Sequence, residues 1–221
     1  MRWIRCVTVA PGEVLRGEPF VTTARDLFII TMDKEPERSV GQGDLSLALA
    51  GAEVIDLLAG EVITLDGDRM TPARQPATDD RLLGEAASSL VRQVPYERVE
   101  DWLWRRGRDL AKAYQADLEQ AGQLTRQRRS RLPFGGERME LVDSPARSRA
   151  MHRWAADEPV LAALAEVVGI PSEQTDDTSS VEDEAVTTVL VAVHDAVMEL
   201  EAVRQRRAIE NAAFANIWRG A

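Results

Sequence analysis

The stretch DLSLALAGAEVIDLLAG, from Asp44 to Gly60, decides the fold. Its apolar residues lie around the whole circumference of a helix rather than on one stripe, so the helix needs cover on every side. Asp44 is expected to be the N-cap of this helix, and Gly60 marks its end. We therefore predict a central, buried helix around which the rest of the chain packs.

Helical patterns recur on both sides of the central segment, and two short segments with glycine turns predict hairpins. The expected helices lie in TTARDLFIITMD, DDRLLGEAASSLVRQ, RVEDWLWRR, RDLAKAYQADLEQAG, the stretches that begin at Ser144-Pro145 and Pro159, and a last long helix through Val186–Val203. The predicted fold is mainly α: a helical bundle core surrounded by amphipathic helices, with a small hairpin near residues 61–71 and a protruding β-hairpin near residues 123–142. The small hairpin is expected to turn at Asp66-Gly67, and the protruding one at Gly135-Gly136.

The composition restricts the function classes. The chain has 221 residues with a formal net charge of -10, and 44% of the residues are hydrophobic. A single cysteine, Cys6, permits no intramolecular disulfide, and two distant histidines do not form a local metal motif. We expect no cofactor and no metal, a cytoplasmic location, and no binding of nucleic acid, which the acidic total disfavours.

Catalysis is the weaker hypothesis. The sequence contains no phosphate-binding glycine loop and no HExxH motif. His194, in VAVHDAVM, is the one candidate for a hydrolase, and a structural role on a helix explains it as well. We therefore expect a protein that is not an enzyme.

Positive charge is concentrated in one part of the acidic chain. Residues 92–131 contain ten basic and six acidic residues, and RQRRSR places four arginines within residues 126–131. Arginine side chains match phosphate oxygens in pairs, and the apolar tip of the hairpin could enter a lipid headgroup layer. An exposed hairpin kept soluble by its arginines, or one that packs on another copy, explains the tract equally well.

In order and spacing, four segments resemble the Golgi phosphoprotein 3 family: TARDLFIITMD, SLALAGAEVIDLLAGEVITL, RLLGEAASSLV, and VEDWLWRRGRDLAKAYQADLEQAGQL with the hairpin after it. The resemblance runs from about Val21 to the C-terminus. It implies a mostly α-helical domain with a protruding β-hairpin that is associated with oligomerisation. Eukaryotic members are peripheral membrane proteins that bind phosphatidylinositol 4-phosphate and capture cytoplasmic tails of glycosyltransferases; bacterial members share the domain.

The resemblance also implies where a lipid pocket would lie. The family tryptophan falls near Gln42, and the arginine of the buried helix falls on Ala50. The family pair R-x-x-R falls on Arg108 and Ala111, with Lys112 adjacent, whereas a shift by one turn gives Arg105 and Arg108.

These observations lead to one main hypothesis and one alternative. The main hypothesis is a non-enzymatic peripheral membrane adaptor at the inner face of the membrane, which binds anionic phospholipid, a phosphoinositide-like headgroup, and cytoplasmic tails of membrane proteins. The expected phosphate ligands are Arg105, Arg108, Lys112, Arg126, Arg128 and Arg129, and the expected hairpin contacts, with membrane or another copy, are Leu132 and Phe134. The alternative is an interaction module that forms homo-oligomers through the 123–142 hairpin without lipid. Residues 1–20 are expected to be a weakly ordered extension, which leaves residues 21–221 as the domain and Val21 as a candidate start of translation.

Overall fold

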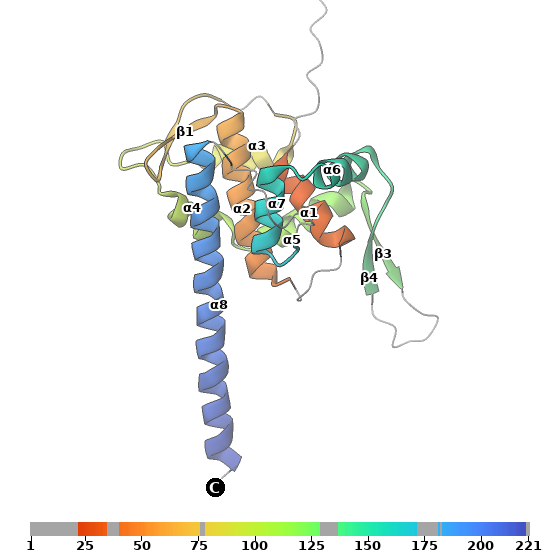
Figure 1. The fold of residues 1–221 in the computed structure, drawn as a ribbon, viewed down its shortest axis with the longest axis vertical. Helices are drawn as coiled ribbons and strands as arrows, with labels where there is room; N and C mark the ends of the chain where they lie inside the picture. Colours follow the sequence, from red (N-terminus) through yellow and green to blue (C-terminus); the bar gives the residue numbers. More distant parts are fainter. Residues whose placement is uncertain are drawn as a thin grey trace, which may run out of the picture.

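In a computed structural model, the described part of the chain comprises residues 22–34, 40–75, 78–128, 137–171, 181 and 183–219. It is mainly helical, with two separate two-stranded antiparallel sheets (Figure 1). The elements are α1 (Thr23–Asp33), α2 (Gln42–Ala59), β1 (Ile63–Asp66), β2 (Arg69–Pro72), α3 (Arg81–Ser88), α4 (Val99–Arg106), α5 (Leu110–Gln120), β3 (Leu124–Arg128), β4 (Glu137–Leu141), α6 (Pro145–Ala155), α7 (Pro159–Val167) and α8 (Glu184–Arg219). The predicted fold class is confirmed. The expected extension at residues 1–20 lies outside the described residues.

Helix α2 is the centre of the molecule, as its composition predicts. Every residue from Leu45 to Leu57 is buried, and α1, α4, α5, α7 and α8 pack around it. Gly51 allows α8 to approach closely, because a Cβ atom at this position would collide with a methyl group of Val193. The absence of a side chain at Gly51 therefore sets the spacing between the two longest helices.

The start of α2 differs from the prediction. The helix begins at Gln42 after Gly41, and Asp44 lies in its first turn, so Asp44 is not the N-cap. Both carboxylate oxygens of Asp44 instead accept hydrogen bonds from Nη1 of Arg204 on α8, at 2.7 and 2.8 Å. The carboxylate still lies near the positive end of the helix, but it binds a side chain rather than the helix backbone.

Other helix starts follow the sequence signals. At the start of α3, the side chain of Asp80 accepts a hydrogen bond from the backbone N–H of Leu83. At the start of α6, the side chain of Ser144 accepts one from the backbone N–H of Arg147, and Pro145 is the first residue of the helix. The small hairpin pairs Asp66 with Arg69, so its turn residues are Gly67 and Asp68 rather than Asp66 and Gly67. Gly67 has a φ of +61°, the left-handed conformation that glycine favours in such a turn.

Many arginines lie in ion pairs that join the helices. Asp26 of α1 is fully buried and binds Arg149 and Arg153 of α6. Arg25 connects Asp80 at the start of α3 with Asp117 of α5, at 3.1 and 2.7 Å. These three arginines, which lie outside the basic stretch 92–131, are therefore engaged by carboxylates of neighbouring helices.

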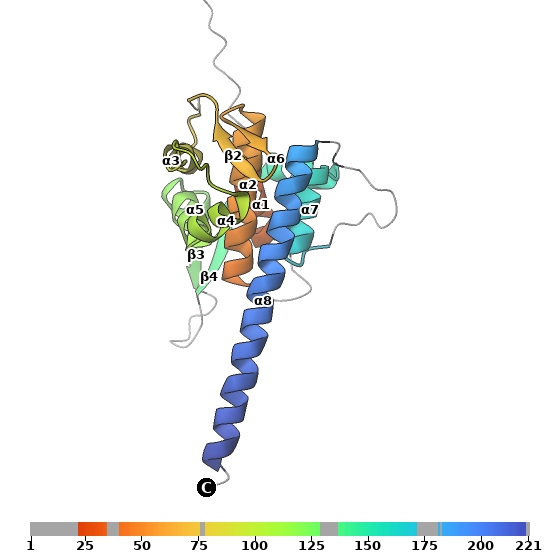
Figure 2. The ribbon, with the colours of Figure 1, turned by 90° about the vertical axis from the view of Figure 1, so that its left-hand side faces the viewer.

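Helix α8 extends past the rest of the body. Its first half packs against α2, α4 and α7, and Arg204 makes the last described ion pair with the body. From Gln205 to Ala212 every residue is exposed, and the helix continues to Arg219 (Figures 1 and 2). None of the described helices is long and apolar enough to cross a membrane.

Candidate functional site

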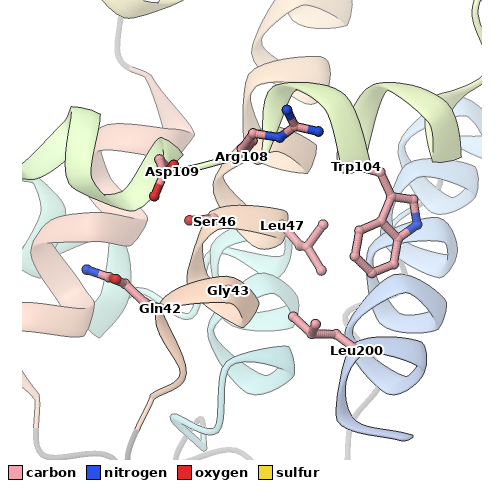
Figure 3. Close-up of a pocket in the computed structure, with 9 residues that line it drawn as sticks. Gln42, Gly43, Ser46, Leu47, Trp104, Arg108, Asp109 and Leu200 are labelled. Carbon is pink, nitrogen blue, oxygen red and sulfur yellow. The ribbon is translucent and has the colours of Figure 1, made fainter. Parts of the chain in front are cut away.

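A cavity lies beside the N-terminal end of α2, between this helix, the turn that joins α4 to α5, and α8 (Figure 3). Its volume is about 350 Å³. It is lined by Gln42, Gly43, Ser46, Leu47, Trp104, Gly107, Arg108, Asp109 and Leu200. The cavity thus combines an apolar wall, which includes Trp104 and Leu200, with polar groups at its other side.

Two glycines bring these elements together. A Cβ atom on Gly43 would lie 2.8 Å from Cδ2 of Leu200, which is closer than side chains tolerate. A Cβ atom on Gly107 would collide with the carbonyl oxygen of Leu103 and would lie 3.3 Å from that of Ser46. The α4–α5 turn and α8 can therefore lie against the first turn of α2 only because both positions lack side chains.

The cavity lies at two helix N-termini. No side chain caps α2 at Gly41, and the first described backbone bond there runs from Leu45 to Gly41, at 3.0 Å. At the start of α5, Ala111 donates its backbone N–H to Oγ of Ser46, at 3.0 Å. The N–H groups of Leu110, Lys112 and Ala113 are also bonded, to the carbonyl oxygens of Gly107 and Asp109, so of the two ends only the start of α2 offers N–H groups without a described partner. Such groups, together with the helix dipole, favour an anion.

Two carboxylates near the cavity are balanced by cations. Asp44 is bound by Arg204, as described above, and Asp109 is bound by Nζ of Lys112 at 2.6 Å. The hydrogen bond from Lys112 lowers the pKa of Asp109, so this carboxylate stays ionised and paired. Within the described part of the chain, the exposed guanidinium of Arg108 forms no hydrogen bond or ion pair. The cavity is therefore polarised toward positive charge by Arg108 and by the helix ends.

The predicted phosphate ligands on α4 and α5 do not converge. Arg108 lines the cavity, and Lys112 lies one turn farther on, paired with Asp109. Arg105 is not among the lining residues. It forms two hydrogen bonds of 2.7 Å with Glu97, and its guanidinium lies 5.1 Å from the ring centroid of Trp102. Its partner Glu97 lies eight residues earlier, farther away in the sequence than Glu100 and Asp101.

The predicted hairpin ligands lie on the other side of the body from α8 (Figure 1). Arg126 of β3 is exposed and pairs with Glu119 of α5, at 3.3 Å, and Arg128 is the register partner of Glu137. Arg129, Leu132 and Phe134 lie outside the described residues. Strand β3 runs toward the end of the molecule at which α2 begins in both views (Figures 1 and 2).

The positions that the resemblance assigned to a lipid pocket divide into two groups. Gln42 and Arg108 line the cavity, although they are far apart in the sequence. Ala50 and Ala111, where family members have arginines, are buried alanines. Sequence reasoning missed Arg204, which lies beside Gly43 and holds Asp44. The one signal in the sequence was that Arg204 is a basic residue on a long predicted helix, which does not indicate its partner.

His194, the candidate for catalysis, is exposed on α8. It lines a groove between α7 and α8 whose other residues are mostly apolar, with Glu166 at its side. In the part of the chain that the structure describes, no group of histidine, cysteine or acidic residues could hold a metal ion.

Comparison with known proteins agrees with the segment order noted in the sequence. A search among curated proteins gives no match. The family model of Golgi phosphoprotein 3 (GPP34) matches residues 24–217, which include all of the helices and strands around the cavity. The chain therefore belongs to the Golgi phosphoprotein 3 family.

Proposed function

We propose that this protein is a non-enzymatic peripheral membrane adaptor whose cavity at the start of α2 binds the phosphate of an anionic lipid headgroup. One observation carries the proposal. Arg108 lines the cavity at the start of α2 and forms no hydrogen bond or ion pair among the described residues, while the carboxylates of Asp44 and Asp109 bind Arg204 and Lys112. A phosphate group would complete this arrangement, because it accepts hydrogen bonds from a guanidinium and from free backbone N–H groups.

The size and the lining of the cavity fit a headgroup. Its volume of about 350 Å³ lies at the lower end of the range typical of small-ligand sites. The ring of Trp104, exposed to 37%, forms part of the apolar wall of the cavity and can contact glycerol or acyl carbons. Of the two positions to which the resemblance assigns arginines in the α4–α5 region, Arg108 is an arginine and Ala111 is not. We therefore propose recognition of anionic phospholipids in general rather than of one phosphoinositide.

Vesicle sedimentation tests the proposal. Vesicles of phosphatidylcholine with phosphatidylglycerol, cardiolipin or phosphatidylinositol 4-phosphate should pull down the protein, and phosphatidylcholine alone should not. Because one basic group near an anionic surface contributes about 1 kcal/mol, Arg108→Ala should weaken binding about fivefold. The effect should shrink as the salt concentration rises.

Arg92→Ala is the matched control, because Arg92 is exposed, lies in the loop after α3 and does not line the cavity. It should leave binding within a factor of two. Equal losses in the two variants would contradict a specific role for the cavity, and binding without anionic lipid would contradict the proposal as a whole.

The adaptor part of the proposal concerns the cytoplasmic side of the membrane. There the protein would hold cytoplasmic tails of membrane proteins near the lipid surface. Crosslinking in membranes would report such clients, and it should lose them when Arg108→Ala releases the protein from the membrane.

The hairpin supports a second candidate function, the interaction module. β3 and β4 form a sheet of two strands, and each strand keeps one edge free of further strands in the described structure. Free edges can pair with another chain. Deletion of residues 129–136 would abolish association if this function holds, and it would leave lipid binding by the cavity unchanged.

A further inference from the structure

The outward face of α8 carries an apolar stripe that no described element covers. Val191, Met198 and Ile209 are exposed to 55%, 57% and 70%. They are three of the seven large hydrophobic residues that are exposed in the described chain. The side of α8 that packs on the body is formed by other residues, Val189, Val193 and Val197 among them. In Figure 2 the outward side of α8 faces the viewer, with α4 on one side and α7 on the other.

The stripe has the spacing of a coiled-coil seam. Val191, Met198, Gln205 and Ala212 recur every seven residues, and Asp195, Ala202 and Ile209 fall between them. All of these residues are exposed. Such a heptad pattern places its residues along one line of the helix, where a second helix can pack. The stripe continues from the half of α8 on the body into the half that extends beyond it.

The extended half of α8 has no packing partner among the described residues. From Gln205 onward the described side chains of α8 are exposed, and the last fifteen residues of the helix, about 22 Å long, lie beyond the ion pair of Arg204. This segment continues the packed half of α8, and its exposed side chains leave room for a second surface to pack against it.

The charge of α8 identifies the partner. Between Glu184 and Glu201 the helix has four acidic residues and no lysine or arginine. Between Ala202 and Arg219 it has four arginines and one glutamate. An antiparallel second copy would set each basic half against the acidic half of the other chain. A parallel copy would set like charges together.

We propose that α8 pairs with α8 of a second copy of this chain, antiparallel and through the stripe. With the two-fold axis beside Leu200, Val191 meets Ile209 of the second copy, and Met198 meets its Ala202. Asp195 then meets Gln205 of the second copy, so polar residues face polar residues and apolar residues face apolar ones.

The groove beside α8 supports the same register. It is lined by Asp68, Arg98, Glu100, Asp195 and Glu199, among others, and these five side chains sum to a negative charge. Arg206 is exposed on the same flank of α8 as Asp195 and Glu199. In the antiparallel pair, Arg206 of the second copy lies level with His194, next to Asp195, and reaches this groove.

The first test measures the mass of the full-length chain by sedimentation at increasing concentration. The wild type should reach twice the mass of one chain. Ile209→Glu buries two charges in the pair, one from each copy, and should weaken association by at least about tenfold. Asn211→Glu, on the opposite side of the same helix, is the matched control and should have no effect. Deletion of residues 129–136 should also leave the pair intact, because the hairpin takes no part in it.

The second test fixes the direction of the pair. Cys6→Ser removes the one natural cysteine, and Val191→Cys or Ile209→Cys is then added to separate chains, one of them tagged. A mixture of the two should form a disulfide between different chains, and Val191→Cys alone should not. Crosslinking of Val191→Cys with itself would overturn the antiparallel register. If the wild type kept the mass of one chain at every concentration, the proposed pairing would be wrong. If Ile209→Glu then also reduced vesicle binding, the stripe would be a lipid contact.

Discussion

Loss of Arg106 should destabilise the fold far more than loss of the adjacent Arg105. Arg106 forms hydrogen bonds of 2.7 and 2.8 Å with Glu53 of α2 and one of 3.0 Å with the carbonyl oxygen of Leu82. The side chain of Glu53 is completely buried, and its other described partner is the hydroxyl of Tyr114, at 3.2 Å. Burial raises the pKa of Glu53, and Arg106 opposes this effect.

Arg106→Met keeps most of the volume and removes the charge, so Glu53 is left buried without its counter-ion and must either stay ionised at a cost or take up a proton. Removing one partner of a buried ion pair costs about 3–5 kcal/mol in the free energy of unfolding. For a chain of this size, each kcal/mol corresponds to about 2–4 °C, so the melting temperature should fall by roughly 6–20 °C. Urea unfolding followed by circular dichroism measures the first quantity, and a thermal melt measures the second.

Arg105→Met is the matched control. Arg105 also binds a carboxylate through two hydrogen bonds, but 44% of its side chain is exposed, and such pairs contribute about 1 kcal/mol or less. The double variant Glu53→Met with Arg106→Met should recover part of the loss, because no buried charge remains. Equal costs for Arg105→Met and Arg106→Met would refute the argument that burial makes the Glu53 pair critical.

Two further predictions concern α2. Burial raises the pKa of Asp56 to about 7, above its ordinary value of 3.8, although the carboxylate accepts backbone hydrogen bonds from Thr23 and Ala24. Between about pH 4 and pH 7 the folded protein therefore retains a proton that the unfolded chain releases, and the free energy of unfolding should fall as the pH rises. Asp56→Asn should flatten this dependence of the free energy of unfolding on pH, measured by urea titrations at several pH values. If the dependence did not change, groups other than Asp56 would cause it. Gly51→Ala places a methyl group against α8 and should cost about 1–3 kcal/mol in the same assay, whereas Gly84→Ala, which meets no neighbour, should not destabilise the protein.

The sequence was sufficient for the central helix because the signal is local and strong. An apolar run from Leu45 to Leu57 needs cover on every side, and the structure provides it. The role of Asp44 could not be predicted, because a carboxylate in the first turn can cap the helix or bind a cation. The choice depends on Arg204, which is distant in the sequence and is brought to Asp44 only by the packing of α8 on α2.

The arginines near the α4–α5 turn show the same limit for the site. Arg105, Arg106 and Arg108 are almost adjacent and chemically identical in the sequence. The fold assigns Arg105 to Glu97 and Arg106 to Glu53, and it leaves Arg108 at the cavity. Helical spacing predicted that Arg105 and Arg108 share a face. The helix is interrupted at Gly107, so α4 and α5 do not continue one another and the spacing rule does not apply.

The proposed α8 pair and the proposed lipid site affect one another. The cavity lies at the end of the body from which α8 extends, and the proposed two-fold axis crosses α8 at the level of Leu200, whose side chain lines the cavity on the other side of the helix. An antiparallel pair points the ends of the two bodies in opposite directions along α8, so a membrane that lies across the end of one body, where its cavity lies, cannot also lie across the end of the other. We therefore expect pairing to compete with membrane binding.

Ile209→Glu, which prevents pairing, should bind anionic vesicles at least as tightly as the wild type at low concentration. At high concentration it should bind more tightly, because a fraction of the wild type is then paired. The control Asn211→Glu adds the same negative charge to the same part of α8, so the comparison removes the general repulsion from anionic lipid. If Ile209→Glu bound more weakly than Asn211→Glu at every concentration, pairing would not compete with the membrane, and the extended half of α8 would instead contribute to lipid binding.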